Sequence, residues 1–342
     1  MKREGRLYER AFSAEALHQA YLDARRNKRG SRSCFEFERY LGTNLARLEQ
    51  ELADGSYRPQ PYFTFWVHEP KPRLIHAPAF RDRVVQHAIY RVVGPAIERG
   101  FIDQSFACRK GLGTHAAADY AQAALRAAPR GSYTLKLDVR RFFYRIDRDI
   151  LRGLLERRLK DACMVELMMA FAVKETVPGS PEELGRGVPI GNLLSQLYGL
   201  VYLNPLDHYI KRELGVHSYA RYVDDMVLFG LTRERADECR ARIVVFLRER
   251  LHLELSRWTL APLSRGVNFV GYRTWAGKRF VRKRSLYNFR RALRHSRLES
   301  VVSILGHARR THSLQHLLHQ TQERNHALYH QLPQSHRRAH HA

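Results

Sequence analysis

Apolar residues recur at helical spacing in several stretches of the chain. In SAEALHQAYLDARRN, residues 13–27, they fall on one helical face, and Ser13 stands where an N-cap residue belongs. The same period runs through FEFERYLGTNLARLEQELADGSY and FRDRVVQHAIYRVVGPAIERG, and from Asp149 to about Ala172. It returns in ERADECRARIVVFLRERL and over residues 285–330. The pattern predicts helices at both ends of the chain and between its strands.

A period of two marks the strands. In YTLKLDVRRFFYRID the apolar face carries Leu135, Leu137 and Val139. The opposite, polar face carries Thr134, Lys136 and Asp138. Further β-type segments lie at 219–230 and 251–260, and QSFACRKGLGTHAAADYAQAALRAA predicts a strand, a turn and a helix. Two hairpins are predicted, turning near Glu69–Lys71 and at Ala276–Gly277. Interleaved strands and helices favour an α+β core with helical segments at both ends.

The net charge of the chain indicates the kind of partner that it binds. Lys and Arg number 59 against 34 for Asp and Glu, so the net charge of the 342 residues is +25. Such an excess favours a polyanionic partner, most often nucleic acid, with an anionic membrane surface as the competitor. No apolar run reaches the roughly 18 residues of a membrane span, and the N-terminus lacks the features of a signal peptide. Four cysteines without CxxC spacing fit reduced thiols, so we expect a cytoplasmic protein.

The stretch YARYVDDMVLFG places two carboxylates, Asp224 and Asp225, between apolar, β-prone arms. Burying like charges side by side is costly unless a cation lies against them. If the strand of Asp138 neighbours this hairpin, Asp138 and Asp224 come close enough to bind a hard divalent cation. The alternative is that the two aspartates only cap a turn. The apolar flanks and Asp138 favour the metal site.

These motifs carry a family resemblance. YVDD on a hairpin, KLDVRRFF upstream and GVPIGNLLSQLYGLVYLNPLD between them resemble a reverse transcriptase over residues 57–290. The resemblance implies a right-hand polymerase with fingers, a ferredoxin-like palm and a helical thumb. The implied domains are a helical N-terminal extension (1–56), fingers (57–135), palm with primer grip (136–283), thumb (284–331) and a basic tail (332–342).

The resemblance also assigns the catalytic centre. Asp138 and Asp224 would hold two Mg²⁺ ions, for which Mn²⁺ can substitute, with Asp225 a weaker ligand and the Val139 carbonyl a further candidate. Phe143 matches the aromatic steric gate that excludes a ribose 2′-hydroxyl; a core Phe is the alternative. Arg73 matches the arginine that grips the triphosphate. The other implied dNTP contacts are Lys71, Ile190, Gly191 and Gln196.

Basic segments are the implied nucleic-acid contacts. Arg81 could face the template or be a surface charge. Arg109, Lys110 and Gly111 precede a helix that we expect Thr114 to cap, with its N-terminus toward template phosphates. NFVGYRTWAGKRFVRK resembles the primer grip, in which Gly271 permits close backbone approach. Its other implied contacts are Tyr272, Arg282 and Lys283. Arg257 and Trp258 stand where the family usually has a lysine that can serve as general acid.

One motif narrows the family. Many reverse transcriptases place Gln before the glycine of PIGNLLSQ, and here Ile190 stands there, as in diversity-generating retroelements. That subtype copies a template-repeat RNA into cDNA with errors opposite adenine. Its partners would be this RNA, the primer or cDNA strand, dNTPs and a small basic helical-bundle accessory protein that is pentameric in similar systems.

Other subtypes and one other class of protein compete with this reading. A group II intron-like, retron or defence-associated enzyme is the first alternative. We expect no room for a maturase and endonuclease module after the thumb. A basic RNA-binding protein with a vestigial polymerase site is the second alternative. We expect bacterial or phage coding, cytoplasmic location and no membrane.

Overall fold

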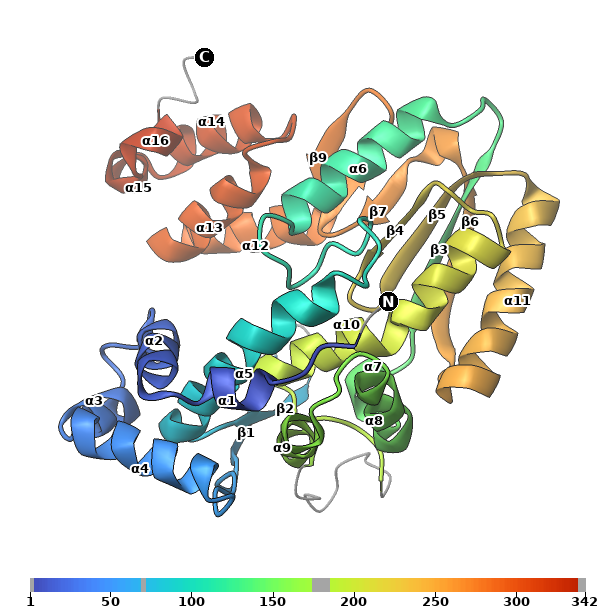
Figure 1. Ribbon diagram of the computed structural model, residues 1–342. Helices are drawn as coiled ribbons and strands as arrows, with labels where there is room; N and C mark the ends of the chain where they lie inside the picture. Colours follow the sequence, from blue (N-terminus) through green and yellow to red (C-terminus); the bar gives the residue numbers. More distant parts are fainter. Residues whose placement is uncertain (1–2, 69–71, 174–184, 338–342) are drawn as a thin grey trace. The chain divides into compact units, whose positions relative to one another are not determined.

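Segments far apart in the sequence assemble into two compact units (Figure 1). The computed structural model describes residues 3–68, 72–173 and 185–337. Unit 1 consists of Met1–Asp103, Val139–Glu213 and Ile243–Ser256. Unit 2 consists of Gln104–Asp138, Leu214–Arg242 and Arg257–Ala342. Each unit therefore takes several separate stretches of chain.

The N-terminal helices of unit 1 pack around a long buried helix. α5 (Phe80–Glu98) buries Val84, Val85 and Ile89, and α2 packs along it. The side chain of Ser13 accepts a hydrogen bond from the Ala16 backbone N–H, which confirms the expected N-cap. The helices that precede α5 are α1 (Leu7–Ala11), α2 (Ala14–Arg25), α3 (Arg32–Glu38) and α4 (Leu41–Ala53).

The remainder of unit 1 consists of a hairpin and a second group of helices. Strands β1 (Phe63–Val67) and β2 (Arg73–Ala77) pair antiparallel, as expected, and the turn at 69–71 lies outside the described residues. The other elements are α7 (Phe142–Arg145), α8 (Arg148–Glu156), α9 (Ala162–Ala172), α10 (Leu193–His208) and the π-helix η1 (Tyr209–Glu213). Twelve of the sixteen residues of α10 are buried, which explains its nearly continuous apolar sequence.

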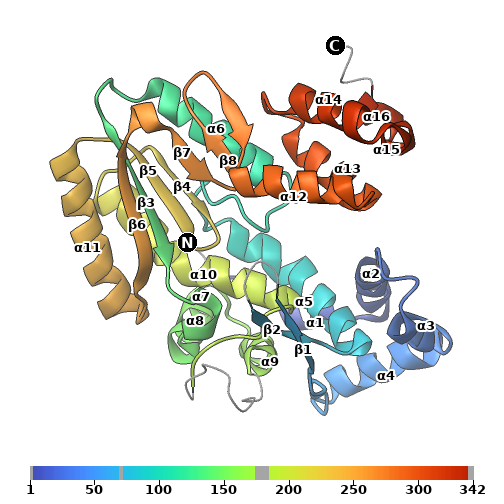
Figure 2. The same ribbon diagram turned by 180° about the vertical axis from the view of Figure 1, so that it is seen from behind.

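A four-stranded sheet forms the centre of unit 2 (Figure 2). Its order is β4-β5-β3-β6. The strands are β3 (Tyr133–Val139), β4 (Tyr219–Tyr222), β5 (Asp225–Leu231) and β6 (Leu255–Pro262). α6 (Thr114–Ala127) lays its alanines on Ala220, Val227 and Phe229 of one sheet face. α11 (Arg233–Leu251) follows β5 and is divided between the two units.

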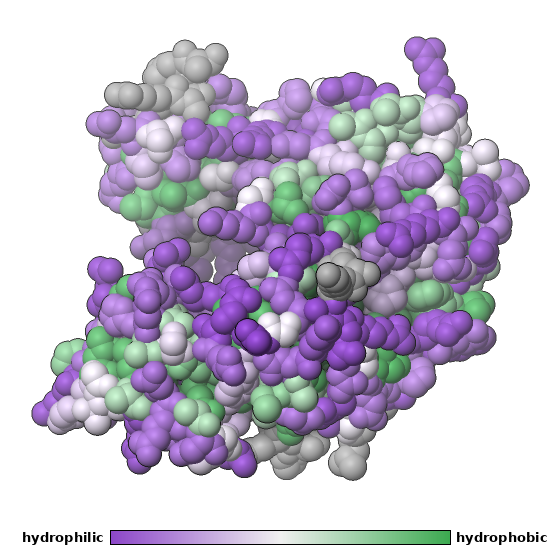
Figure 3. All heavy atoms as spheres, in the orientation of Figure 1, coloured by the Kyte–Doolittle hydropathy of each residue, from purple (hydrophilic) through white to green (hydrophobic). Residues whose placement is uncertain are grey.

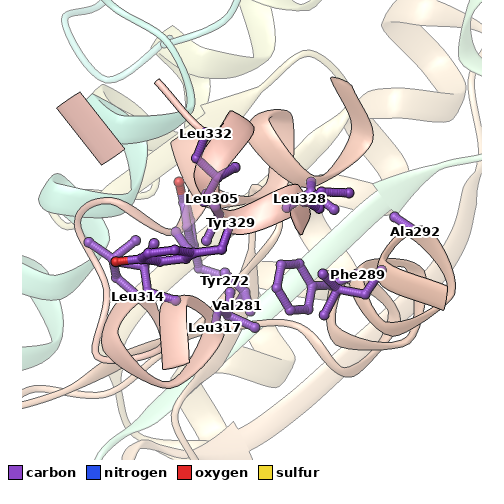
Figure 4. Close-up of a cluster of buried hydrophobic side chains, with 14 of the residues drawn as sticks. Tyr272, Val281, Phe289, Ala292, Leu305, Leu314, Leu317, Leu328, Tyr329 and Leu332 are labelled. Atoms are coloured by element: carbon purple, nitrogen blue, oxygen red, sulfur yellow. The ribbon is translucent and has the colours of Figure 1, made fainter. Parts of the chain in front are cut away.

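A three-stranded sheet and a helical cluster complete unit 2. A short 3-10 turn, η2 (Leu263–Arg265), precedes β7 (Val267–Phe269), β8 (Tyr272–Thr274) and β9 (Arg279–Val281). Figure 4 shows how Tyr272 and Val281 of this sheet join the core of the C-terminal helices around Phe289 and Leu317. These helices are α12 (Lys283–Arg294), α13 (Leu298–Ala308), α14 (Leu314–Arg324), α15 (His326–Gln331) and α16 (Gln334–Arg337).

The arrangement confirms the α+β class and corrects two local expectations. No strand forms at 104–108; Ser105 makes only an isolated bridge with Arg221. Thr114 does not cap α6 either, because Gly113 occupies the N-cap position and no side chain bonds the free N–H groups there. Gly113 has φ +140°, which a threonine would adopt only with strain.

Hydrophilic side chains cover much of the face in Figure 3, in keeping with the high charge of the chain. Across residues 3–68, 72–173 and 185–337, no helix combines the length and hydrophobicity that a membrane crossing requires.

Candidate active site

The central sheet of unit 2 gathers the three candidate carboxylates at one end. β3 pairs antiparallel with β5, and Asp138 lies directly opposite Asp225. β4 and β5 form a tight hairpin in which Tyr222 pairs with Asp225, leaving Val223 and Asp224 as its two-residue turn. The strand of Asp138 therefore neighbours the hairpin, which is the condition on which the metal-site hypothesis depended. The register, which sequence could not supply, makes Asp225 the cross-strand partner and puts Asp224 at the tip.

The hairpin turn is strained. Val223 has φ +58°, a left-handed conformation that β-branched residues rarely adopt. Arg221, which is fully buried, donates a hydrogen bond of 3.0 Å from Nη1 to the Val223 carbonyl. Strain of this kind persists only where the surroundings impose it, and it is common at functional sites. Arg221 is thus a structural support of the carboxylate turn that sequence reasoning missed.

Lys136 holds the Asp225 carboxylate. Its Nζ lies 2.8 Å from Oδ1 and 2.9 Å from Oδ2, with hydrogen-bond geometry to Oδ2. The same ammonium donates to the Asn268 carbonyl of β7 at 2.8 Å. Lys136 therefore joins a candidate catalytic carboxylate to the backbone of the three-stranded sheet. Its position two residues before Asp138, on the polar face of the strand, was the signal that could have predicted this role.

Burial and neighbouring charges act on Asp225 in opposite directions. Burial raises the pKa of Asp225, and the Lys136 ammonium and the Arg282 guanidinium oppose that rise, while Asp138 adds to it. Burial lowers the pKa of Arg282, and Asp225 opposes that change. The Asp225 carboxylate is thus partly dehydrated, and the neighbouring cations Lys136 and Arg282 favour its ionised form.

The donor set fits a hard divalent cation. Carboxylate oxygens are the ligands that Mg²⁺ and Mn²⁺ prefer. Asp225 Oδ1 is buried, and the Lys136 ammonium lies 2.8 Å from it, so this oxygen already faces a cation. In the described part of the chain, however, no three carboxylate, imidazole or thiolate side chains already converge on one point.

The segment that resembles the primer grip packs on a C-terminal helix. Gly271 has φ +89°, and the His307 imidazole packs closely against it. A Cβ on Gly271 would lie only 2.7 Å from His307 Nε2. Tyr272 stacks on this ring at 4.1 Å between centroids and donates from its hydroxyl to the His307 carbonyl at 2.8 Å. In this structure the close neighbour of Gly271 is therefore the His307 side chain. Arg282 is half-buried, and Lys283 is exposed in the first turn of α12.

The loop before α6 is only partly available to a ligand. Arg109 is half-buried and donates from Nη1 to the Ser105 carbonyl at 2.9 Å, so it braces its own loop. Lys110 and Gly111 are exposed, and Gly111 has φ +78°. Of this group, Lys110 is the cation that stands toward solvent.

The candidate nucleotide residues of unit 1 gather beside β2. The Ile190 carbonyl accepts a hydrogen bond from the His76 backbone N–H at 2.7 Å. A Cβ on Gly191, which has φ +108°, would stand 2.8 Å from Ile75 Cγ2. Arg73 is exposed at the start of the same strand. The structure thus brings Ile190 and Gly191 to the strand of Arg73.

Phe143 lies next to α10. Its ring packs on Phe142 at 5.2 Å between centroids, and a Cβ on Gly199 would stand 3.2 Å from it. Gln196 is exposed one helical turn before Gly199 and shares its face. Phe143 is half-buried, which leaves part of the ring for a ligand.

Two residues of the predicted set stand apart. The Arg81 guanidinium pairs with Glu51 and lies 5.1 Å above the Tyr57 ring, so its contacts are internal to unit 1. Its side chain is 22% exposed, so it is not the solvated surface charge that its sequence allowed, and the template contact stays a prediction. Lys71 lies outside the described residues.

Comparison with known proteins identifies the class of the molecule. A family model described as reverse transcriptase (RNA-dependent DNA polymerase) matches residues 68–274, which is more than half of the chain. A telomerase from Candida albicans, solved with the TWJ fragment of telomeric RNA, superposes with a TM-score of 0.50 at 14% identity. That superposition covers 79% of this chain and 55% of the telomerase chain. The fold is that of a reverse transcriptase.

Two curated relatives extend the match. Protein YkfC of Escherichia coli (strain K12) is 25% identical over 293 residues, covering 72% of this chain and 74% of YkfC. The group II intron-encoded protein LtrA of Lactococcus lactis subsp. cremoris is 25% identical over 212 residues, covering 60% of this chain but only 35% of LtrA. The chain belongs to the reverse transcriptase family, whose members are RNA-directed DNA polymerases that generally use divalent metal ions.

Proposed function

We propose that this reverse transcriptase extends a DNA primer on an RNA template with Asp138, Asp224 and Asp225 as its catalytic carboxylates. The observation that carries the proposal is the register that sets Asp138 opposite Asp225 beside the strained turn of Asp224. The carboxylates, with the Val139 carbonyl as a further candidate ligand, would hold two Mg²⁺ or Mn²⁺ ions. When bound, such ions lower the pKa of the primer 3′-hydroxyl and offset the triphosphate charge.

The other residues bind and orient the substrates. Arg73 offers a planar bidentate donor for triphosphate oxygens. Phe143 would collide with a ribose 2′-hydroxyl and so select deoxynucleotides. Ile190 cannot hydrogen-bond the nucleotide, so base selection would depend on shape more than on polar contacts. Lys283 and Lys110 offer exposed cations for nucleic-acid phosphates.

Two subtypes remain open, and each has support. Ile190 and the SFACRKGLGTH and NFVGYRTW segments favour a diversity-generating retroelement enzyme, which copies a template-repeat RNA with errors opposite adenine and works with a small basic accessory protein. Similarity to LtrA supports a group II intron-like enzyme. Sequencing cDNA made with and without a co-encoded small basic protein separates them, since errors concentrated at adenine support only the first.

The carboxylate assignment is tested by Asp224→Asn. This change removes one negative charge at the hairpin tip, and we expect primer extension to fall by on the order of 10³-fold. Binding of the RNA template should stay nearly unchanged, because the phosphate contacts are cationic. Asp237→Asn on α11 is the matched control, because this carboxylate is half-buried and lies 3.6 Å from Arg240. Wild-type extension by Asp224→Asn would refute the assignment.

A further inference from the structure

Unit 2 has a surface pocket away from the candidate carboxylates. Its volume is about 650 Å³, and it lies where the end of α6, the loop before β3, η2 and the β8–β9 turn meet. β3 begins at Tyr133, next to this pocket, and reaches Asp138 five residues later. An extended strand of that length spans roughly 16 Å. The pocket is therefore at the opposite end of the sheet from the catalytic carboxylates.

The lining of the pocket is cationic and aromatic. Arg126, Arg130 and Lys278 line it and are exposed, and no lining residue is acidic. Trp275 supplies an aromatic ring, with Lys278 Nζ 5.5 Å and the Arg273 guanidinium carbon 5.3 Å from the ring centroid. Cations gathered around a half-buried indole, without a carboxylate among them, favour an anionic ligand that also has a flat face.

The backbone holds Trp275 in this place. Its indole N–H donates to the Ser264 carbonyl at 3.2 Å. Gly266 lies so close to the ring that a Cβ there would stand 2.8 Å from it. Arg126 donates to the Ala276 carbonyl at 3.3 Å, and Gln122 donates to the Trp275 carbonyl at 3.3 Å. A preorganised ring loses little entropy when a ligand stacks on it.

We propose that this pocket, the Trp275 pocket, binds a nucleotide of single-stranded RNA. The base stacks on Trp275, and Arg126, Arg130 and Lys278 take the adjacent phosphates. Single-strand binding sites combine these two elements, a basic groove and an aromatic platform. An acidic peptide would use the cations but would leave the flat ring without a function. The inference rests on the proposed function, because the RNA strand is the one that the polymerase copies or carries.

Photocrosslinking tests the position of the strand. A single-stranded RNA carrying 5-iodouridine is irradiated with the wild-type protein without dNTPs or metal, and the tryptic peptides are sequenced. Cleavage after Arg273 and Lys278 releases the peptide Thr274–Lys278, which contains Trp275. We expect the crosslink on this peptide, with displacement by poly(U). A crosslink map without it overturns the inference, as does equal displacement by polyglutamate or by an abasic sugar-phosphate chain.

Affinity tests the stacking. Trp275→Ala should weaken single-stranded RNA binding about ten-fold, the effect of losing one stacked base. Trp275→Phe keeps an aromatic face and should retain most of the affinity, which also excludes a folding defect as the cause. Trp258→Ala is the matched control, because Trp258 is an exposed indole that also has a cation on its ring, with the Arg240 guanidinium carbon 4.3 Å from the ring centroid. Equal losses in Trp275→Ala and Trp258→Ala, or none in either, would contradict the proposal.

Salt dependence tests the phosphate contacts. Each phosphate contact with a single strand contributes roughly 0.7 to the slope of log K for RNA binding against log salt concentration. The triple change Arg126→Gln, Arg130→Gln and Lys278→Gln should therefore lower the magnitude of this slope by about two. A triple change of the same charge on α11, Arg242→Gln, Arg248→Gln and Arg250→Gln, should leave the slope nearly unchanged. Equal slopes for the two triple variants would overturn the inference.

The outcomes separate this inference from the proposed function. If the wild type extends primers but crosslinks elsewhere, the Trp275 pocket is wrong and the polymerase assignment stands. If the crosslink falls on Thr274–Lys278 but no primer is extended with Mg²⁺ or Mn²⁺, the polymerase assignment fails and the pocket remains an RNA site.

Discussion

The carboxylate region of unit 2 and the candidate nucleotide region of unit 1 are built by different means. Around Asp225, charges decide the arrangement: Lys136 pairs with the carboxylate, and buried Arg221 supports the strained turn. Around Ile190, close packing decides it, because Gly191 lies against β2 where a Cβ would clash with Ile75. The difference suggests that metal chemistry depends on balanced charge and nucleotide choice on shape. Variants in each region should therefore fail differently.

Among the variants that compare the two regions, the largest effect should come from breaking the ion pair between Lys136 and Asp225. In Lys136→Met, Asp225 loses its ammonium partner and remains half-buried. Removing one partner of a buried ion pair lowers the free energy of unfolding by about 3–5 kcal/mol. Because the Asp225 side chain is 23% exposed, we expect a value at the lower end of this range. We expect kcat for primer extension to fall about 100-fold, with a higher Mg²⁺ concentration needed for half-maximal rate. The measurement is steady-state extension over a Mg²⁺ titration.

Two further variants show whether the charge is responsible. Lys136→Arg restores a cation and should recover part of the rate, which a purely steric role would not allow. Asn268→Ala keeps the backbone carbonyl that Lys136 bonds and changes only an exposed side chain, so it should behave as wild type. Equal rates for Lys136→Met and wild type would contradict the role of the ion pair.

The matching change in unit 1 is steric. Gly191→Ala adds a Cβ 2.8 Å from Ile75 Cγ2 and 3.2 Å from the His76 carbonyl oxygen, at φ +108°. Such strain costs roughly 1–3 kcal/mol. We expect the KM for dNTPs to rise about ten-fold with little change in RNA affinity. Gly153→Ala is the control, because it lies in α8 with no atom within 4 Å of the added Cβ and should be neutral or slightly stabilising.

A higher RNA dissociation constant with unchanged KM for dNTPs would assign Gly191 to the template side instead. That result would remove the contrast between the two regions, since both would then act on nucleic acid.

Sequence patterns predicted the elements better than their contacts. The period of two in β3 placed Asp138 on the polar face, and the apolar arms of YVDD predicted the hairpin, because both signals are local. Register is not local, so the pairing of Asp138 with Asp225 could not be read from the chain. The role of His307 was missed for the same reason, because its partner Tyr272 lies 35 residues away in sequence. Arg81 is a further example, since its ion-pair partner Glu51 lies thirty residues away in sequence. Arg221 bonds a carbonyl only two residues away, but its complete burial could not be read from the chain.

A smaller effect should test shape selection. Ile190→Gln introduces an amide where an aliphatic side chain stands, and it should lower the misincorporation frequency by a few-fold through new polar contacts with the nucleotide. Deep sequencing of cDNA from both forms measures this. Ile190→Leu keeps an apolar side chain of similar volume and is the control. Identical error spectra for Ile190→Gln and wild type would remove Ile190 from base selection.

The smallest effect should come from His307, which combines shape and charge inside unit 2. Burial lowers the pKa of His307, the hydrogen bond to the Gly271 backbone opposes this, and the charges of His115 and Arg282 add to it. The folded state therefore resists protonation of His307. Neutral His307 contributes to the free energy of unfolding above the ordinary histidine pKa of about 6.5, and this contribution is lost as the pH falls below that value.

The test compares Tm at pH 7.5 and pH 5.5 for wild type and His307→Gln. Other groups titrate in both proteins, so the informative quantity is the difference between their pH dependences. We expect the wild type to lose more stability than His307→Gln, by about 2 °C or less. His319→Gln is the control, because His319 is 60% exposed and pairs with Glu323 on its own helix. If His307→Gln loses as much stability as wild type, the packing of His307 on Gly271 and Tyr272 is a matter of shape alone.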